Sequence, residues 1–277
     1  MLRFAPIAVA LAACLACEPG RSASVPNLPD DSAGRIVARA IEASGGWKRW
    51  FELEDVAFVT TFTIYDSFGD VASESIGLQK APLHGSPRVR FESLGLAEAV
   101  TLGFDGKSPW MMRGGAPVRD PGPLAFARFN MVSSVFWFAL PFSLAEMPVT
   151  LADLGAQSVK GHSWQRVKVT LAAGAPEAPG DWFVIYFDEQ TGLIDHLLAH
   201  ITASFLRHDL WVGRWLDFQD CTGIRKERRR QFYPADDEGN VIGELVVDQL
   251  VEDVRFNNHF AAEIFDKPLP LRGENQT

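Results

Sequence analysis

The chain has 277 residues, of which 47% are hydrophobic and 22% are charged, a composition typical of a globular protein rather than a disordered one. Its formal net charge of −9 argues against a general nucleic-acid-binding protein, because that class is usually basic. The aromatic residues are mostly Phe, so much of the aromatic surface has no polar group that needs a partner.

The N-terminus has the pattern of a bacterial lipoprotein signal peptide. A charged Arg3 precedes a short apolar stretch of small residues that ends in cysteines. The lipobox pattern of residues 11–14 favours lipidation of Cys14, whereas the usual length of the apolar region favours Cys17. An uncleaved membrane anchor is the alternative interpretation, but the stretch is short for a span.

These features predict the domain organisation. Residues 1–17 are the signal peptide, and residues 18–31, which are rich in Pro, Ser and Gly, form a flexible tether. A single domain follows over residues 32–272, and residues 273–277 form a C-terminal tail.

The domain begins with a helix and continues with strands. Ser32 is expected to cap the helix, and Gly45 and Gly46 end it. From Asp55 the hydrophobic period changes to two, which places alternate residues up to Ile64 on one face of a strand. The next strands are predicted at residues 71–80, 88–93, 99–104 and 107–113.

A charge-free stretch of 17 residues lies between Arg128 and Glu146. It is shorter than the roughly 20 residues that a membrane span needs, and it contains Pro141, which would interrupt a helix. We therefore predict a helix from about Pro123 to Leu140 that is apolar nearly all round, so protein or ligand must cover most of its surface.

Strands resume after this helix and continue to residue 256. They are predicted at residues 149–155, 164–171, 182–188, 193–206, 214–220, 224–233 and 244–256. Strands at such short intervals without helices between them predict one large antiparallel sheet. The fold class is therefore α+β and mainly β: a curved sheet of about eleven strands forming a half-barrel, closed by the N-terminal helix and the mid-chain apolar helix.

Several stretches resemble the outer-membrane lipoprotein-sorting superfamily, the LolA/LolB-like half-barrels, in a divergent bacterial lipoprotein branch. The stretches are RIVARAIEASGGWKRWFELEDVAFVTTFTI, FDGKSPWM, FWFALPFSLAE, DWFVIYFDEQTGLIDHLLAHIT and VEDVRFNNHFAAEIFDKP. The resemblance covers Ala33 to Pro268 and departs from the pattern at Gly223-Ile224, which Arg225 follows where a nearby Pro is expected. It implies an incomplete barrel around a hydrophobic cavity for acyl chains, although fold alone does not establish function.

The predicted cavity lining combines the apolar helix with aromatic residues of the first strands. Its members are Phe129, Val132, Phe136 and Phe138 of the helix, and Phe58, Phe62 and Trp110 of the strands. The alternative is that the helix is ordinary core filler.

The sequence RKERRR, from Arg225 to Arg230, is the strongest charge run. One interpretation is an edge strand whose charges prevent aggregation. The other places Arg225, Arg228 and Arg230 at the cavity mouth, where their guanidinium groups pair lipid phosphates or carboxylates.

The other candidate groups point away from catalysis and metal binding. His196 and His200 belong to a predicted strand, which places them about 13 Å apart, too far for one metal ion. Asp188 and Glu189 stand at a turn, where acidic residues are common. Cys221 is expected to be buried and unpaired. The chain has no motif of a serine hydrolase, nucleotide-binding protein or zinc protease, so we expect no metal and no cofactor.

Together these features predict a non-catalytic periplasmic protein, anchored by lipid, at the outer membrane. We expect it to bind a lipid or the acyl chains of a lipoprotein in the half-barrel, and not to bind nucleic acid. One alternative is a structural or assembly lipoprotein of the outer membrane with a filled barrel and an unidentified protein partner. The other is a hydrolase with an unrecognised site.

Overall fold

The computed structural model describes residues 27–85, 87–171, 181–202 and 208–268. The candidate lipidation sites Cys14 and Cys17, the signal peptide and most of the tether lie outside the described residues. The predicted domain end at residue 272 and the tail 273–277 lie outside them too.

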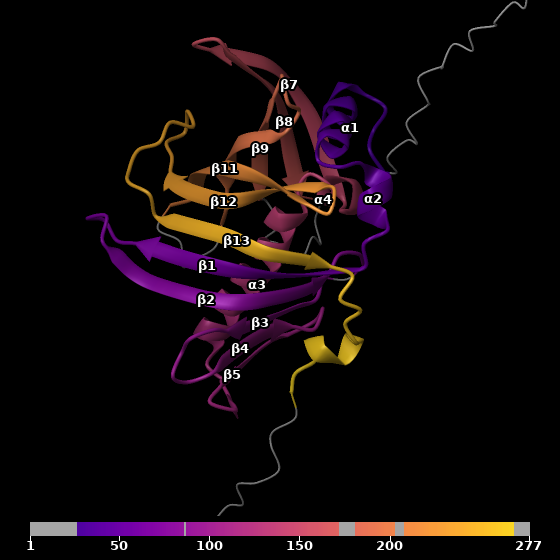
Figure 1. Ribbon diagram of the computed structural model, residues 1–277. Helices are drawn as coiled ribbons and strands as arrows, with labels where there is room; N and C mark the ends of the chain where they lie inside the picture. The colour runs from indigo at the N-terminus through magenta and orange to yellow at the C-terminus, as the bar shows by residue number, and fades with distance from the viewer. Residues whose placement is uncertain (1–26, 86, 172–180, 203–207, 269–277) are drawn as a thin grey trace, which may run out of the picture.

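The described residues form one curled antiparallel sheet, which confirms the predicted fold class (Figure 1). In chain order, its strands are β1 (Asp55–Tyr65), β2 (Val71–Pro82), β3 (Val89–Ser93), β4 (Val100–Phe104), β5 (Pro109–Arg113), β6 (Ala116–Pro117), β7 (Val149–Val159), β8 (His162–Leu171), β9 (Trp182–Asp188), β10 (Ile194–His200), β11 (Leu210–Cys221), β12 (Ile224–Pro234) and β13 (Val247–Phe256). The two-residue strand β6 was not predicted, since two residues carry no periodic pattern.

The sheet consists of two meanders that meet in its middle. The order of the strands is β6-β5-β4-β3-β2-β1-β13-β12-β11-β10-β9-β8-β7, so the first strand of the domain pairs with the last. In this central pair Phe62 lies opposite Gln249. The strands β6 and β7 are the two edges, and the chain crosses from one edge to the other through α3 (Pro121–Ala139) and α4 (Ser143–Glu146).

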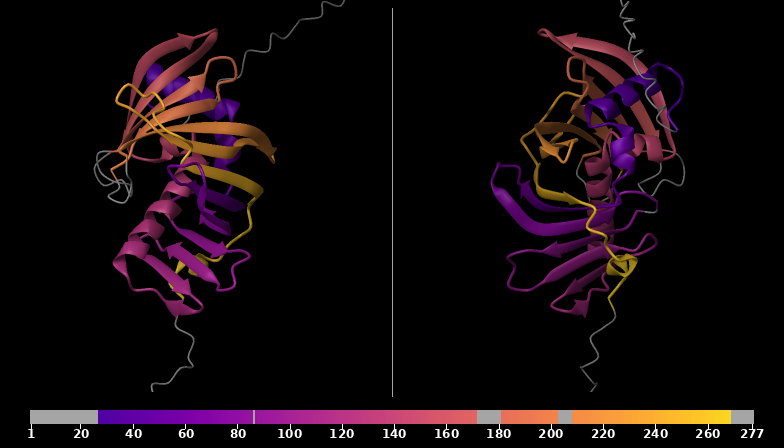
Figure 2. Two further views of the ribbon diagram at one scale, coloured as in Figure 1. Left: turned by 90° about the vertical axis from the view of Figure 1, so that its left-hand side faces the viewer. Right: turned by 45° about the vertical axis from the view of Figure 1, so that its right-hand side comes forward.

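Helix α3 lies along one face of the curled sheet, which we call the inner face (Figure 2). The side chain of Asp120 caps its N-terminus by accepting a hydrogen bond from Gly122 N at 3.0 Å, and Pro141 follows its end. The prediction of a helix ended by Pro141 is therefore confirmed, with a start two residues earlier. No helix among the described residues is long and apolar enough to cross a membrane.

Two further helices cover one end of the half-barrel. They are α1 (Ser32–Ala43) and the short α2 (Trp47–Phe51), and a 3-10 turn, η1 (Ala262–Phe265), follows the last strand. The N-cap of α1 is Asp31, not the expected Ser32, because the Asp31 carboxylate accepts from Gly34 N at 2.9 Å. Gly45 and Gly46, with φ of 121° and 88°, end α1 as expected.

Stacked aromatic rings join α2 to the start of α4, and α3 to the sheet. The rings of Trp50 in α2 and Phe142 lie 4.3 Å apart and nearly parallel, and the indole of Trp50 donates to Glu146 of α4. Further along the inner face, Phe138 of α3 stacks on Phe58 of β1 at 4.8 Å. The end of α3 that lies near α2 and α4 is therefore fully packed.

Candidate ligand cavity and buried polar cluster

A cavity of about 620 Å³ lies between α3 and the inner face of the sheet. This volume is within the range of roughly 300–1,000 Å³ that is usual for small-molecule sites. Among the residues that line it are Thr60, Phe62, Ile64, Ser75, Gln79, Phe91, Leu96, Leu102, Met111, Ala127, Phe129, Met131, Ser134, Trp137, Trp211, Phe232 and Gln249. The wall is mostly apolar, which favours a hydrophobic ligand.

One stripe of α3 supplies much of the helical part of the wall. Pro123, Ala127, Asn130, Ser134 and Trp137 follow one another at steps of three and four, which is the spacing of one helix face. Ala127, Asn130 and Ser134 of this stripe are small or polar. The aromatic residues Phe129 and Trp137 of α3 also line the cavity, whereas Phe136 and Phe138 are buried in the core.

Alternate residues of the strands supply the opposite wall. Phe62 of β1 pairs with Ser75 of β2, and Leu102 of β4 pairs with Met111 of β5, and all four line the cavity. Because the side-chain period of a strand is two, the residues directly before and after each of these four along its own strand face the outer side of the sheet.

Two of the predicted lining residues, Phe62 and Phe129, lie on the cavity wall. Phe58 and Phe138 stack on each other in the core and are fully buried. Val132 and Phe136 are also buried in the core, where Phe136 contacts the ring of Phe183. Helix α3 is apolar nearly all round, but its uncharged polar residues Asn130, Ser133 and Ser134 all line the cavity, and they are the signal in the sequence that marks the cavity-facing side.

Trp110 lies on the outer face, and not in the cavity where it was expected. Its indole donates a hydrogen bond to Phe265 O of the turn η1 at 2.9 Å. Its ring covers Gly103 on the neighbouring strand, where an added Cβ would lie 2.1 Å from the ring. The neighbouring Met111 takes the place on the cavity wall, since adjacent strand residues face opposite sides.

Four buried polar side chains form a hydrogen-bonded cluster on the cavity wall. Ser134 of α3 donates to Gln79 Oε1 at 2.9 Å. The side-chain amide nitrogen of Gln249 donates to Thr60 Oγ1 at 3.1 Å and to Ser134 Oγ at 3.4 Å. The exposed fractions of these four side chains range from 0% for Gln79 to 8% for Ser134, although all four line the cavity. The cluster therefore marks the inner part of the wall.

The basic run forms β12, which lies between β11 and β13 in the interior of the sheet. Its interpretation as a protected edge strand is therefore wrong. The three arginines predicted to meet at the cavity mouth do not gather there. Arg225 and Arg228 are exposed, and Arg228 pairs with Glu252, whereas Arg230 is completely buried.

The run also contains a buried charge cluster that sequence reasoning missed. Glu227 lies between two cations, with Lys226 Nζ 3.2 Å from its Oε2 and Arg230 Nε 3.2 Å from its Oε1, and none of the three is more than 1% exposed. Lys226 also donates to Leu140 O at the end of α3, at 2.9 Å. Burial lowers the pKa of Lys226, because desolvation disfavours its charged form. The signal in the sequence was Glu227 itself, a single acidic residue within a run of basic ones.

The histidine cluster on the predicted strand forms aromatic pairs. His196 stacks on Tyr186 at 4.0 Å and hydrogen-bonds Asp195 at 2.7 Å, and that hydrogen bond lowers the pKa of Asp195. His200 stacks on Trp182. Asp188 accepts hydrogen bonds from Thr191 within its turn, and Cys221 is buried and unpaired. Within the described ranges, no three His, Cys, Asp or Glu residues gather as a metal site would require.

The fold and the cavity define a class: an open half-barrel with a helix on its inner face and an apolar cavity beneath that helix. Comparison with solved structures finds the same fold in a DUF1329 family protein from Desulfovibrio piger, with a TM-score of 0.56 and 10% identity over 85% of this chain and 98% of that one. A LolA superfamily protein from Nitrosomonas europaea matches with a TM-score of 0.53 and 13% identity over 85% and 97% of the two chains.

A domain of the outer membrane lipoprotein-sorting type from Vibrio parahaemolyticus matches with a TM-score of 0.50 and 9% identity, over 84% of this chain and 95% of that one. No protein-family model and no curated protein matches the sequence. The predicted LolA-like resemblance is thus confirmed at the level of the fold, and identities this low show the fold alone.

Proposed function

We propose that this protein is a periplasmic lipoprotein that binds a lipid or the acyl chains of a lipoprotein without chemical conversion. The observation that carries the proposal is the apolar cavity of about 620 Å³ beneath α3. The LolA-like fold supports it, because similar proteins include one of the lipoprotein-sorting type. The lipobox at Cys14 or Cys17 supports a lipid anchor, and we place the protein at the outer membrane.

The energetics suit reversible binding. Burial of an acyl chain of about fourteen methylenes, at roughly 0.8 kcal/mol each, would release about 11 kcal/mol. The cost of ordering the chain and the protein reduces the net affinity well below this value. Such a reduction allows a carrier to release its ligand.

The proposal is tested by filling the mouth of the cavity. Ser75 of β2 is exposed and lines the cavity, so Ser75→Trp places a large ring in it. Ile76→Trp is the matched control, because the next residue of the strand faces the outer side. Binding of the uncharged dye N-phenyl-1-naphthylamine should weaken about tenfold or more in Ser75→Trp and stay unchanged in Ile76→Trp.

Lipid extraction of the purified protein followed by mass spectrometry provides a second measurement. Co-purified lipid supports the proposal. Absence of both lipid and dye binding, together with a stably bound protein, would instead identify a structural or assembly lipoprotein.

A further inference from the structure

The inner part of the cavity wall has more hydrogen-bond donors than acceptors. Ser134 Oγ accepts from Gln249, so its single proton is directed to Gln79 Oε1. This arrangement fixes the orientation of the Gln79 amide. The amino group, Nε2, then has no acceptor among the described residues, although Gln79 is 0% exposed and lies on the cavity wall.

The same inner face carries further unpaired donors beside this cluster. Arg230 is the cross-strand neighbour of Gln249, and Trp215 is the neighbour of Arg230 on the other side. Adjacent strands are about 4.8 Å apart, so these side chains form one row. The three guanidinium nitrogens of Arg230 and the indole nitrogen of Trp215 are buried and make no hydrogen bond within the described part of the chain.

Glu227 forms an ion pair with Arg230 but no hydrogen bond. Its Oε1 lies 3.2 Å from Arg230 Nε, and both atoms are buried without a hydrogen-bond partner among the described residues. Glu227 is also shared with Lys226, so two cations face one carboxylate. A buried donor without an acceptor costs about 1–3 kcal/mol, and more when it is charged. The complement of this region is therefore a group rich in acceptor oxygens and carrying negative charge.

We infer that the cavity binds a single-chain amphiphile with a carboxylate head, such as a fatty acid, and that the head is bound at the inner end. Gln79 Nε2 donates to the carboxylate, and the buried charge of Arg230, one strand beyond Gln249, stabilises it through the low-dielectric interior. The acyl chain extends along the apolar wall past Phe62 and Phe129. The inference rests on the proposed function and names the ligand class of the same site.

The geometry at the mouth agrees with this orientation. Two charged residues, Glu74 and Arg113, border the cavity, and both are exposed. Glu74 is turned to the outer face, where its carboxylate accepts a hydrogen bond from Thr63 at 3.2 Å. Solvent screens the exposed charge of Arg113, so selection for a carboxylate comes from the buried donors at the inner end.

The test compares ligands that differ in the head alone. Palmitic acid, hexadecanol and methyl palmitate each displace N-phenyl-1-naphthylamine from the full-length protein at about pH 8, where the acid is ionised. We expect the acid to bind at least about tenfold more tightly than the alcohol, which equals about 1.4 kcal/mol. In Gln79→Met and Arg230→Met, the ratio of the affinity for the acid to the affinity for the alcohol should fall toward one. The affinity for the alcohol itself should remain.

Two variants serve as controls. Gln231→Met makes the same substitution on the next residue of β12, beside Arg230 on the opposite face, and should keep the preference. Gln79→Glu places a negative charge at the head site and should reverse the preference in favour of the alcohol. Circular dichroism confirms that each variant is folded, and Gln79→Glu supplies the answer if Gln79→Met does not fold.

Each outcome decides between the proposals. Equal binding of acid and alcohol by the wild type, with the dye bound, overturns the inference but leaves the proposed function intact. A preference that survives in both Gln79→Met and Arg230→Met overturns the assigned head site. Failure of the wild type to bind the dye contradicts the proposed function itself.

Discussion

At the scale of single residues, the buried cluster of Lys226, Glu227 and Arg230 carries a large desolvation cost. Three charged side chains with at most 1% exposure are costly to desolvate, and their mutual attraction offsets this cost in part. Lys226 also holds the end of α3 through Leu140 O and lies 5.0 Å above the ring of Phe138. The cluster therefore links β12 to the helix that borders the cavity.

Removing the acidic member of this cluster should strongly destabilise the protein. Glu227→Gln leaves two buried cations without a counter-charge, and we expect the free energy of unfolding to fall by about 3–5 kcal/mol, measured by denaturant unfolding. Glu252→Gln removes the partner of the exposed Arg228 and should change stability little. Equal effects of the two substitutions would contradict the structural role of the cluster.

A second residue-scale prediction concerns pH. The hydrogen bond to Glu146 raises the pKa of His84 above its ordinary 6.5, while partial burial opposes this shift. Because the folded-state pKa is raised, the stabilisation is fully present below about pH 6.5 and is lost as the pH rises through the folded-state value.

The free energy of unfolding should therefore fall from about pH 6 to about pH 8, by less than about 1 kcal/mol because the pair is partly exposed. Thermal melts of the wild type and His84→Gln should converge as the pH rises. The exposed His162→Gln serves as the control. A constant difference between wild type and His84→Gln across this range would show that His84 does not titrate there.

At the scale of elements, α3 performs two tasks along its length. Toward its C-terminus it is packed by rings, with Phe138 against Phe58 and Trp137 against Phe183, Trp215 and Phe232. Toward its N-terminus its small residues leave the cavity. The predicted alternatives of core filler and cavity lining are therefore both present in one helix.

This division separates stability from binding. Phe138→Ala should lower the free energy of unfolding by about 3–5 kcal/mol, because it removes a fully buried ring. Phe129→Ala, at a half-buried position on the cavity wall, should lower stability less and weaken dye binding several-fold. Undiminished dye binding by a folded Phe129→Ala protein would remove Phe129 from the proposed ligand contacts.

The sequence predicts the elements well because their signals are local. The alternation around Phe62 identifies β1, and Pro141 marks the end of α3. The faces are harder to predict. Trp110 lies on the outer side because of its register with Gly103, and Arg230 is buried because it lies on the inner face between its cross-strand neighbours Trp215 and Gln249. Both facts depend on pairing between distant strands, which no single segment encodes.

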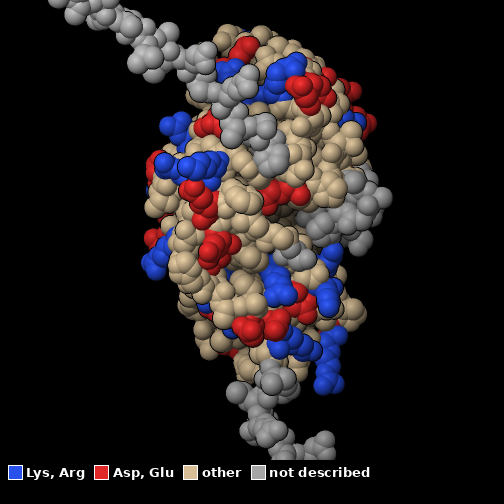
Figure 3. Space-filling view, turned by 90° about the vertical axis from the view of Figure 1, so that its right-hand side faces the viewer, with Lys and Arg blue, Asp and Glu red and all other residues tan. Residues whose placement is uncertain are grey.

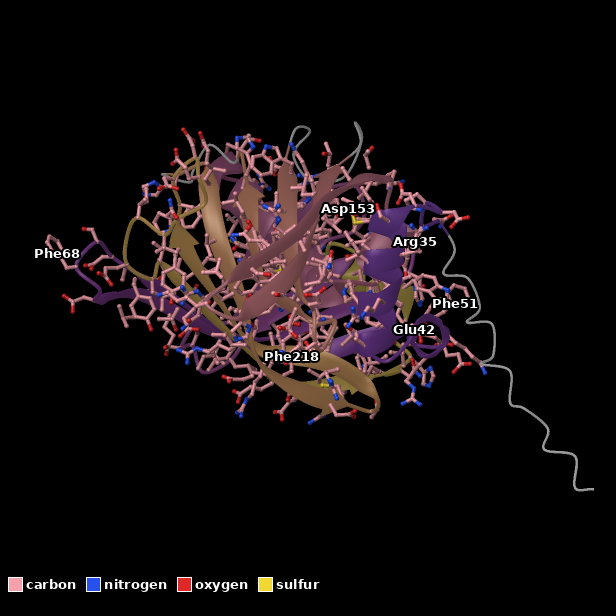
Figure 4. All side chains as sticks on the ribbon, turned by 90° about the horizontal axis from the view of Figure 1, so that it is seen from above. Arg35, Glu42, Phe51, Phe68, Asp153 and Phe218 are labelled. Atoms are coloured by element: carbon pink, nitrogen blue, oxygen red, sulfur yellow. The ribbon has the colours of Figure 1, made fainter. Side chains whose placement is uncertain are left out.

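At the scale of the whole molecule, the two ends of the half-barrel differ. Figure 4 shows Phe68 at the tip of a projecting hairpin, with Phe51, Arg35 and Glu42 at the opposite end beside α1 and α2. Phe68 is 87% exposed. The face at the α1 and α2 end carries positive and negative residues interspersed with each other (Figure 3). The hairpin joins β1 and β2, whose residues Ile64 and Ser73 line the cavity, so the base of the hairpin borders the cavity.

The lipid anchor is a prediction about the whole molecule. Replacement of both Cys14 and Cys17 by Ser should move the protein from the membrane fraction to the soluble fraction, because the lipobox then has no cysteine to modify. The Cys221→Ser protein is the control and should stay with the membrane. A processed double variant that remains membrane-bound would contradict the anchor.

The pairing of β1 with β13 also constrains how the chain folds. Each meander forms from contacts between neighbouring strands, but the central pair joins Val56 to Phe256, two segments at opposite ends of the domain. Contacts of such long sequence separation slow folding, because the loop between them must be closed first. The half-barrel cannot be completed until residues 247–256 are available for pairing, so a partly folded chain exposes the free edge of β1, which favours aggregation until the last strand pairs with it.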